Sequence, residues 1–442
     1  MRTRTSLART LLLAAGLAAA LQPALWAGGK QEAAAGKPAE VKINMIMHPV
    51  LYAATGGKDG LITAFQKASG YQIEVITAPF DQILEKTAID FVSGTSSNDI
   101  FTYNDTAQHK GLAGKLLQLD DYIKKAEPAY DFADFIKAAV DISNFDGKNY
   151  GIPFRYGVYM LHYRLDLFEK YGVKAPETWD EFLAAAKKIT EGLRKDGVAD
   201  VYGLVHPGEA GLIIYEVYKT WLAGHGGFIA DAGGKIRINS LEAVKALEVL
   251  IAPFRGGWAS PETPGMPLDK SIAAFQNGKA AMALSYSPYW GLFNDPAKSQ
   301  VAGKVGWALT PHSPGVKPGR SSFSGWQLLI NNKTKFKDQA WEVVKHLTTK
   351  EAMLESATKY ANGPIRKSVI SNPAFVAKFP VSKGWLEGFN ASEPVLPGGH
   401  EKIGLMMDAI GREVSGALIG QKTPQQALDD AAKKIDEIFK GK

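Results

Sequence analysis

GIPFRYGVYMLHYRLDLFEKYGVKAPETWDEFLAAAKKIT, from Gly151 to Thr190, says more about the architecture of this 442-residue chain than any other stretch. Its apolar and aromatic run at 152–163 predicts a buried strand. Thr178, followed three residues later by Glu181, has the pattern of a capping box, which predicts that an amphipathic helix begins there. The stretch therefore predicts a buried strand that leads into a helix. Its role is expected to be structural and not catalytic.

Before this stretch, strand and helix patterns alternate along the chain. The apolar runs at 41–47, 71–77 and 99–103 predict strands. The periodic segments at 61–68 and 82–92 predict helices. Such alternation with short loops favours an α/β fold with a parallel sheet covered by helices on both faces.

After this stretch, the predicted helices are longer. The periodicity predicts helices at 179–194, 213–223, 241–254 and 270–277 and strands at 202–205 and 280–285. Thr423, Pro424 and Gln426 predict the start of a last helix, because they place a hydroxyl cap, a proline in the first turn and a reciprocal amide together. A chain of this length is expected to form two domains, each with its own core.

The amino terminus has the three-part layout of a secretory signal peptide. Arg2, Arg4 and Arg9 precede an apolar stretch at 11–21, and small residues follow up to Ala27. Eleven apolar residues are too few for a membrane-spanning helix, which needs about 20. We therefore expect residues 1–27 to be a signal peptide that is cleaved after Ala27.

The composition of the remaining chain is typical of an exported protein that diffuses freely. Residues 28–40 are Gly, Ala, Lys, Gln, Glu and Pro, which predicts a disordered tether. The chain has no cysteine, and this excludes disulfides, thiolate catalysis, cysteine metal sites and a lipidated cysteine anchor. Removal of the signal peptide leaves 48 basic and 45 acidic residues, a balance too even to indicate nucleic-acid binding. The periplasm is the expected location.

Several phrases of the sequence resemble one known family. The phrases are "YRLDLFEKYGV" and "TWDEF" in the opening stretch, "AFQNGKAAMALSYSPYW" from Ala274 and "SFSGWQLLINN" from Ser322. They are similar to segments of the extracellular solute-binding proteins of ABC importers, family 1, the maltose-binding-protein type. The resemblance extends over nearly the whole chain after the predicted signal peptide.

This resemblance implies a two-lobed α/β fold, the type II periplasmic binding protein, with a hinge and a central ligand cleft. It places residues 41–153 and 326–366 in lobe 1 and residues 154–325 and 367–442 in lobe 2. A solute in the cleft would close the hinge. The resemblance also implies a monomer that delivers its solute to ABC permease subunits in the inner membrane, without enzyme activity, cofactor or metal.

The candidate site residues follow from where strands end. Ligands of open α/β sheets bind beyond the carboxyl ends of the strands. In lobe 1 this rule selects His48, Phe80, Asp81, Tyr103, Asn104 and Asp105. From lobe 2 and the crossover segments we add Arg155, Tyr156, Glu209, Tyr286, Tyr289, Trp290, Trp326 and Arg366. Carboxylates, amides and arginines beside flat aromatic rings suit sugars and polyols, which present hydroxyls and a weakly polar C–H face.

Each candidate also has a structural interpretation. Asp105 could cap a following helix, and Glu209 could do the same. Arg155 could form an interlobe salt bridge, and Arg366 could be a surface charge. Trp290 and Tyr289 could be packing residues.

The solute is expected to be small. In oligosaccharide-binding members of the family an aromatic cluster often follows a proline-containing turn near the carboxyl terminus. Here that turn is "EPVLPGGHEKIG", which contains no aromatic residue. A monosaccharide, polyol or small disaccharide fits a site with fewer stacking surfaces.

Two other functions stay open at the level of sequence. A phosphorylated glycerol or a peptide would need several Lys or Arg around it, and Arg155, Arg320 and Arg366 leave this open. An exported carbohydrate-active enzyme would need a pair of carboxylates. No P-loop, H-E-x-x-H or G-x-S-x-G motif is present, and the eight histidines have no metal-ligand spacing.

Overall fold

The computed structural model describes residues 41–107, 109–396 and 400–440. The predicted signal peptide, 1–27, and tether, 28–40, lie outside the described residues. No helix in the described part of the chain is long and apolar enough to cross a membrane.

The strands of the described residues are β1 (Lys42–Met47), β2 (Gln72–Thr77), β3 (Ile100–Asn104), β4 (Asn144–Phe145), β5 (Lys148–Asn149), β6 (Gly151–Arg164), β7 (Tyr202–Val205), β8 (Ala280–Tyr286), β9 (Val305–Ala308) and β10 (Phe323–Ile330). Helices of the first half are α1 (Pro49–Ala54), α2 (Leu61–Ser69), α3 (Phe80–Ser93), α4 (Asp120–Ala126), α5 (Lys137–Asp141), α6 (Leu165–Lys170), α7 (Trp179–Lys195) and α8 (Leu212–Gly224). Helices of the second half are α9 (Leu241–Arg255), α10 (Leu268–Gln276), α11 (Trp290–Phe293), α12 (Lys337–Leu347), α13 (Lys350–Tyr360), α14 (Lys367–Ile370), α15 (Pro373–Lys378), α16 (Ser382–Ala391), α17 (Ile403–Leu418) and α18 (Pro424–Phe439). Every strand and helix for which the sequence predicted a range is present, with its ends within two residues of the prediction.

The main sheet is mixed. Its strand order is β2-β1-β3-β10-β6-β8-β7, with β9 also paired to β6. β1 is parallel to β2 and β3, as the alternating pattern before residue 151 predicted, and β7 is parallel to β8. The central strand β10 is antiparallel to both β3 and β6, and β6 is antiparallel to β8, so the prediction of a parallel sheet is wrong for these strands. β10 comes from much later in the chain than β1–β3, so the alternating pattern of those early strands does not determine its direction.

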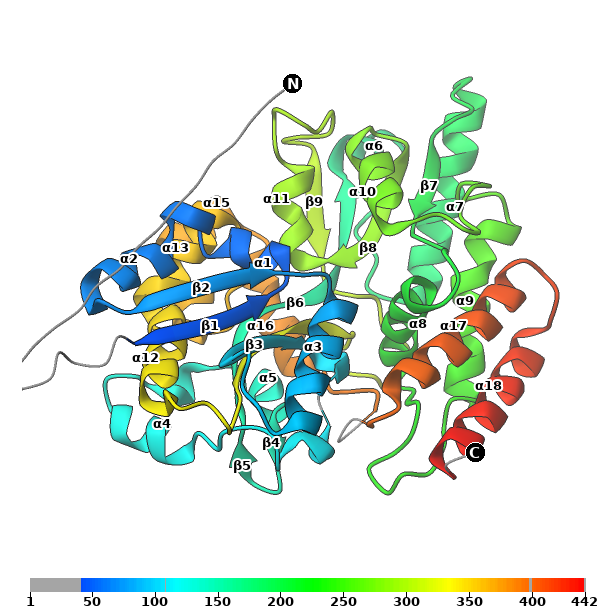
Figure 1. Ribbon diagram of the computed structural model, residues 1–442. Helices are drawn as coiled ribbons and strands as arrows, with labels where there is room; N and C mark the ends of the chain where they lie inside the picture. The colour runs from blue at the N-terminus through cyan, green and yellow to red at the C-terminus, as the bar shows by residue number, and fades with distance from the viewer. Residues whose placement is uncertain (1–40, 108, 397–399, 441–442) are drawn as a thin grey trace, which may run out of the picture. The chain divides into compact units, whose positions relative to one another are not determined.

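The long strand β6 joins two groups of elements. Its first part, from Gly151 to Val158, pairs with β10. Its second part, from Tyr159 to Arg164, pairs with β8 and β9. Figure 1 shows β1–β3 with α1–α3 and α12 on one side of this strand and β7 and β8 with α7–α10, α17 and α18 on the other.

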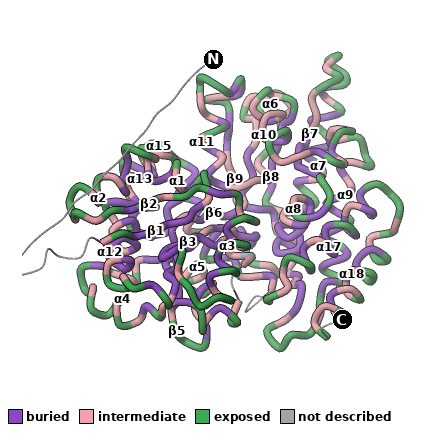
Figure 2. The backbone as a smooth tube through the Cα atoms, viewed as in Figure 1, coloured by how far each residue is buried: buried purple, intermediate pink, exposed green. Residues whose placement is uncertain are grey.

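Most residues of the central strands are buried, as the purple tube shows (Figure 2), and the buried apolar residues form the cores. Helices α7–α9, α17 and α18 enclose one cluster, in which Trp179 stacks on Trp221 at 5.6 Å and on His225 at 5.0 Å. The predicted capping boxes are both formed, one by Thr178 with Glu181 and one that opens α18. These cores hold the strand ends in place.

We expect the protein to lose stability in mild acid because buried histidines resist protonation. Burial lowers the pKa of His162 on β6 to about 3 and that of His225 to about 4. The unfolded chain therefore takes up protons below pH 6.5 that the folded chain does not, so stability falls with pH between 6.5 and about 4. Each histidine contributes roughly 2 kcal/mol of this loss by pH 5.

Urea unfolding at pH 7.5 and pH 5 checks this prediction with His162→Asn. An asparagine can keep a polar contact with Ser285, whose hydroxyl lies 3.1 Å from the Nδ1 of His162. The variant should lose about 2 kcal/mol less than the wild type between the two pH values. Equal losses in the two proteins would contradict the assignment.

Candidate ligand site

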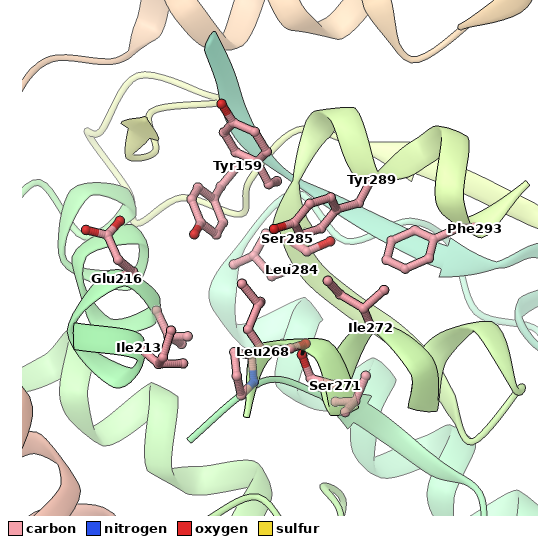
Figure 3. Close-up of a pocket in the computed structure, with 14 residues that line it drawn as sticks. Tyr159, Ile213, Glu216, Leu268, Ser271, Ile272, Leu284, Ser285, Tyr289 and Phe293 are labelled. Carbon is pink, nitrogen blue, oxygen red and sulfur yellow. Dashed lines mark hydrogen bonds between the residues drawn. The ribbon is translucent and has the colours of Figure 1, made fainter. Parts of the chain in front are cut away.

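A pocket opens between α8, α10 and the carboxyl end of β8 (Figure 3). It encloses about 90 Å³. It is lined by Tyr159, Val205, Pro207, Ile213, Glu216, Val217, Leu268, Ser271, Ile272, Leu284, Ser285, Tyr286, Tyr289 and Phe293. Most of these side chains are apolar, and the polar ones are hydroxyls and one carboxyl group.

Several of the hydroxyls in the pocket already have partners. Ser271 donates to the carbonyl of Leu268 at 2.7 Å, and Ser285 pairs with a buried histidine. Tyr286 donates to the carbonyl of Ser324 on β10 at 2.7 Å.

Three polar groups of the pocket have no hydrogen-bond partner among the described residues. They are the hydroxyls of Tyr159 and Tyr289 and the buried Oε1 of Glu216. A buried polar atom without a partner is costly in a folded protein. These three groups are therefore the ones available to a solute.

A buried lysine, Lys219, lies between Glu216 on α8 and Asp105, which follows β3. The Nζ of Lys219 lies 2.7 Å from Oε2 of Glu216 and 3.9 Å from Oδ2 of Asp105. Burial lowers the pKa of Lys219, but the two carboxylates outweigh it and the net shift is upward. Burial raises the pKa of Glu216, which Lys219 only partly opposes. The lysine is held as a cation between two carboxyl groups.

Asp105 connects β3 to β10. It follows β3 in a short 3-10 turn, Asp105–Ala107. Its Oδ1 accepts hydrogen bonds from the hydroxyl of Ser324 at 2.7 Å and from the N–H of Gly325 at 3.0 Å. Within the described residues it is Asn104, not Asp105, that accepts from the backbone of this turn. The interpretation of Asp105 as a helix cap is therefore wrong.

Aromatic rings gather beside this carboxylate. Trp326 on β10 lies 5.1 Å from the ring of His48 and 5.3 Å, edge on, from the ring of Phe80. All three side chains are partly exposed. His48 follows β1 and caps α1, accepting from the N–H of Val50. They form an aromatic wall, with His48 directly after β1, Phe80 at the start of α3 and Trp326 on β10.

Arg155 is paired with Trp326 across β6 and β10, and its charge acts on residues of both the aromatic wall and the pocket. Burial and then the charge of Arg155 lower the pKa of His48 on one side. On the other side, burial raises the pKa of Tyr286 and Tyr289, and Arg155 opposes that rise. The guanidinium is partly exposed and makes no hydrogen bond or ion pair with a described residue. The interpretation of Arg155 as an interlobe salt bridge is therefore wrong within the described structure.

The structure thus brings most of the predicted residues to one place. They are His48, Phe80, Asn104, Asp105, Arg155, Tyr286, Tyr289 and Trp326. The backbone of Asp81 lies in α3 beside them, but its side chain is outside what the structure describes.

Other predicted residues lie in the cores. Tyr156 is fully buried and accepts a hydrogen bond from Gln327 at 3.1 Å. Tyr103 is hydrogen-bonded to Thr87, and burial raises its pKa to about 12. Trp290 is buried beside His162, with 6.3 Å between the rings. Of these three, Tyr103 also contacts the aromatic wall, with its ring 6.4 Å, edge on, from that of Phe80.

Arg366 and Glu209 do not join the group. Arg366 is fully buried, its Nη1 lies 3.6 Å from Asp134, and its guanidinium packs 3.9 Å from the ring centre of Phe135. The interpretation of Arg366 as a surface charge is therefore wrong. Glu209 is exposed, and its carbonyl accepts from the N–H of Ile214 at the start of α8.

The sequence interpretation missed Tyr159, Glu216 and Lys219. The sequence does contain a signal for Glu216 and Lys219, because they are charged residues three positions apart in the otherwise apolar helix of 212–224. Charged side chains in such a segment need partners when they are buried. Tyr159 lies four residues after Arg155 in β6, so the two share one face of the strand.

Comparisons with known proteins agree with this geometry. Residues 53–354 match the family described as bacterial extracellular solute-binding protein. A probable ABC transporter-binding protein of Deinococcus radiodurans is 27% identical over 371 residues, which cover 83% of this chain and 86% of that protein.

Two solved structures are similar over most of the chain. The ABC transporter solute-binding protein of Agrobacterium radiobacter in complex with ribitol has a TM-score of 0.79 and 28% identity, covering 91% of this chain and 100% of that one. The corresponding protein of Agrobacterium vitis with bound D-mannitol has a TM-score of 0.71 and 26% identity, covering 90% and 99%. The predicted two-lobed, type II binding-protein fold is confirmed, and so is the resemblance noted in the sequence. The family is one of substrate-binding proteins and not of enzymes, and this chain belongs to it as a bacterial extracellular solute-binding protein.

Proposed function

We propose that the protein is the periplasmic solute-binding component of an ABC importer and that it captures a small carbohydrate. The observation that carries the proposal has two parts: a pocket with three unpaired polar groups, and an unpaired arginine that acts on two of the pocket's tyrosines and on the His48 of the aromatic wall. Aromatic faces pack on the C–H side of a sugar or polyol, while hydroxyls pair with tyrosine, carboxyl and guanidinium groups. The ribitol and mannitol bound by the similar proteins are solutes of this class.

The mode of action follows from the fold. β6 and β10 pair with each other and run between the two lobes, so bending of these strands would close the cleft over the solute. We propose the lobe boundaries given above, export through the cleavable segment 1–27, and action as a monomer. The solute would be a monosaccharide, polyol or small disaccharide and would pass unaltered to the permease.

A phosphorylated solute is the weaker alternative. A phosphate favours several cations around it. Of the three arginines considered from the sequence, only Arg155 acts on residues of the pocket, through its charge on Tyr286 and Tyr289. Arg320 is paired with Glu393 at 3.1 Å, and Arg366 is buried next to Asp134.

An enzyme is also disfavoured. The two carboxyl groups nearest the pocket, Asp105 and Glu216, both pair with Lys219. A glycosidase needs one carboxyl group as an acid and another as a base or nucleophile, on opposite sides of the bond to be cleaved. A bound sugar recovered by chromatography should therefore be chemically unchanged.

The proposal predicts stabilisation by a carbohydrate that depends on the aromatic wall. Melting temperatures should be measured with D-glucose, D-galactose, D-xylose, ribitol, D-mannitol and maltose. A ligand at 100 times its Kd should stabilise the protein by about 2.7 kcal/mol. Trp326→Ala should weaken the binding of any carbohydrate that stabilises the wild type by about 2 kcal/mol, roughly thirty-fold in Kd. The reason is that the substitution removes a central aromatic surface.

A matched control is Trp258→Ala, since Trp258 is also partly buried but follows α9 and lies away from the pocket. The control should bind as the wild type does. If none of the six compounds shifts the melting temperature, the carbohydrate assignment fails and the fold assignment stands.

A further inference from the structure

We propose that the captured carbohydrate carries a small apolar substituent, a short alkyl chain or a single aromatic ring, and that this group enters the pocket. The inference rests on the proposed function and names the substrate class of the same site. The expected solutes are alkyl or aryl glycosides of a small sugar, which should bind in the same site as the bare sugars and more tightly than they do.

One side of the pocket is apolar. Leu268 and Ile272 lie one turn apart on α10, and Leu284 and Phe293 complete this side. Figure 3 shows Leu268 and Ile272 on the side of the pocket away from Tyr159. Apolar side chains of this kind favour an apolar group and offer nothing to a hydroxyl.

The polar groups that remain free are gathered on the other side. Figure 3 places Tyr159, Tyr289 and Glu216 around the upper part of the pocket. The serine of the apolar side, Ser271, already donates its hydroxyl proton to the carbonyl of Leu268. A sugar hydroxyl placed on this apolar side would lose its water and gain no matched partner. The hydroxylated part of the solute therefore belongs at the upper side and the apolar part below it.

The volume fits such a substituent. The pocket encloses about 90 Å³, and a single water needs roughly 10–15 Å³ of the same measure. Several non-hydrogen atoms can therefore enter, which is the scale of a short alkyl chain or one six-membered ring.

Calorimetric titration with matched pairs of compounds tests the inference. The probes are D-glucose, D-galactose and D-xylose, each with its methyl and phenyl β-glycoside. At least one phenyl glycoside should bind about ten-fold more tightly than its parent sugar, since apolar atoms in an apolar pocket discriminate by at least this factor. Ile272→Thr should lower the affinity for that glycoside about ten-fold and change the affinity for the parent sugar by less than three-fold.

Ile89→Thr is the matched control, because Ile89 lies on α3, is 60% exposed and does not line the pocket. Melting temperatures of the unliganded variants show whether each one folds. If the parent sugars bind and no glycoside binds more tightly, the inference is wrong and the proposed function stands. Equal weakening of sugar and glycoside by Ile272→Thr would also overturn it. If neither sugars nor glycosides bind, both proposals fail.

Discussion

Replacing Lys219 by methionine should lower the free energy of unfolding by about 3–5 kcal/mol, because it leaves two carboxyl groups without their shared cation. The side chain of Lys219 is only 7% exposed, and it lies 2.7 Å from Glu216 and 3.9 Å from Asp105. Methionine fills a similar volume, so the loss reflects charge more than packing. Urea unfolding at pH 7.5 measures the difference.

The matched control is Lys187→Met on α7. Lys187 is about half exposed and lies 3.9 Å from Glu191, so its loss should cost less than about 1 kcal/mol. Adding Glu216→Gln to Lys219→Met should recover part of the stability, because it removes one unpaired charge. The loss should also shrink at pH 5, because burial raises the pKa of Glu216 and the unpaired carboxyl group can take up a proton. A loss no larger than that of the control would contradict the buried ion pairs.

The sequence predicted the elements well because their signals are local. Capping boxes and apolar periodicity depend on residues a few positions apart, and the box at Thr178 and Glu181 formed as expected. The strand-end rule found His48 after β1 and Asp105 after β3 for the same reason. The antiparallel direction of β10 was not predictable, because it depends on the pairing of Trp326 with Asn104, far away in the chain.

The pocket was harder to predict because it depends on which face of a strand meets the cleft. In β6, Tyr156 and Tyr159 lie three residues apart, so their side chains point to opposite faces. The sequence interpretation chose Tyr156, which is buried in the core, and missed Tyr159, which lines the pocket. The partners of Lys219 illustrate the same limit, since Asp105 comes from a separate strand end more than a hundred residues earlier. Arg366 was misplaced because its partner, Asp134, is also remote.

Gly325→Ala should destabilise the protein by about 3 kcal/mol, at the upper end of what overpacking a core costs. A Cβ at Gly325 would lie 2.2 Å from the Cγ of Tyr156 and 2.4 Å from the carbonyl oxygen of Arg155. Neither atom can move easily, because the ring of Tyr156 is fully buried and the carbonyl belongs to the strand paired with β10. Displacement of β10 would also stretch the 3.0 Å bond from the Gly325 N–H to Asp105.

Thermal and urea unfolding of Gly325→Ala should be compared with those of Gly114→Ala. A Cβ at Gly114 would meet no atom within 4 Å, so the control should change stability by no more than about 0.5 kcal/mol. Because Gly325 lies between Asp105 and Trp326, the variant that remains folded should also bind its carbohydrate more weakly than the control does. If the two alanine variants were equally stable, the close packing of β10 against Tyr156 would be wrong.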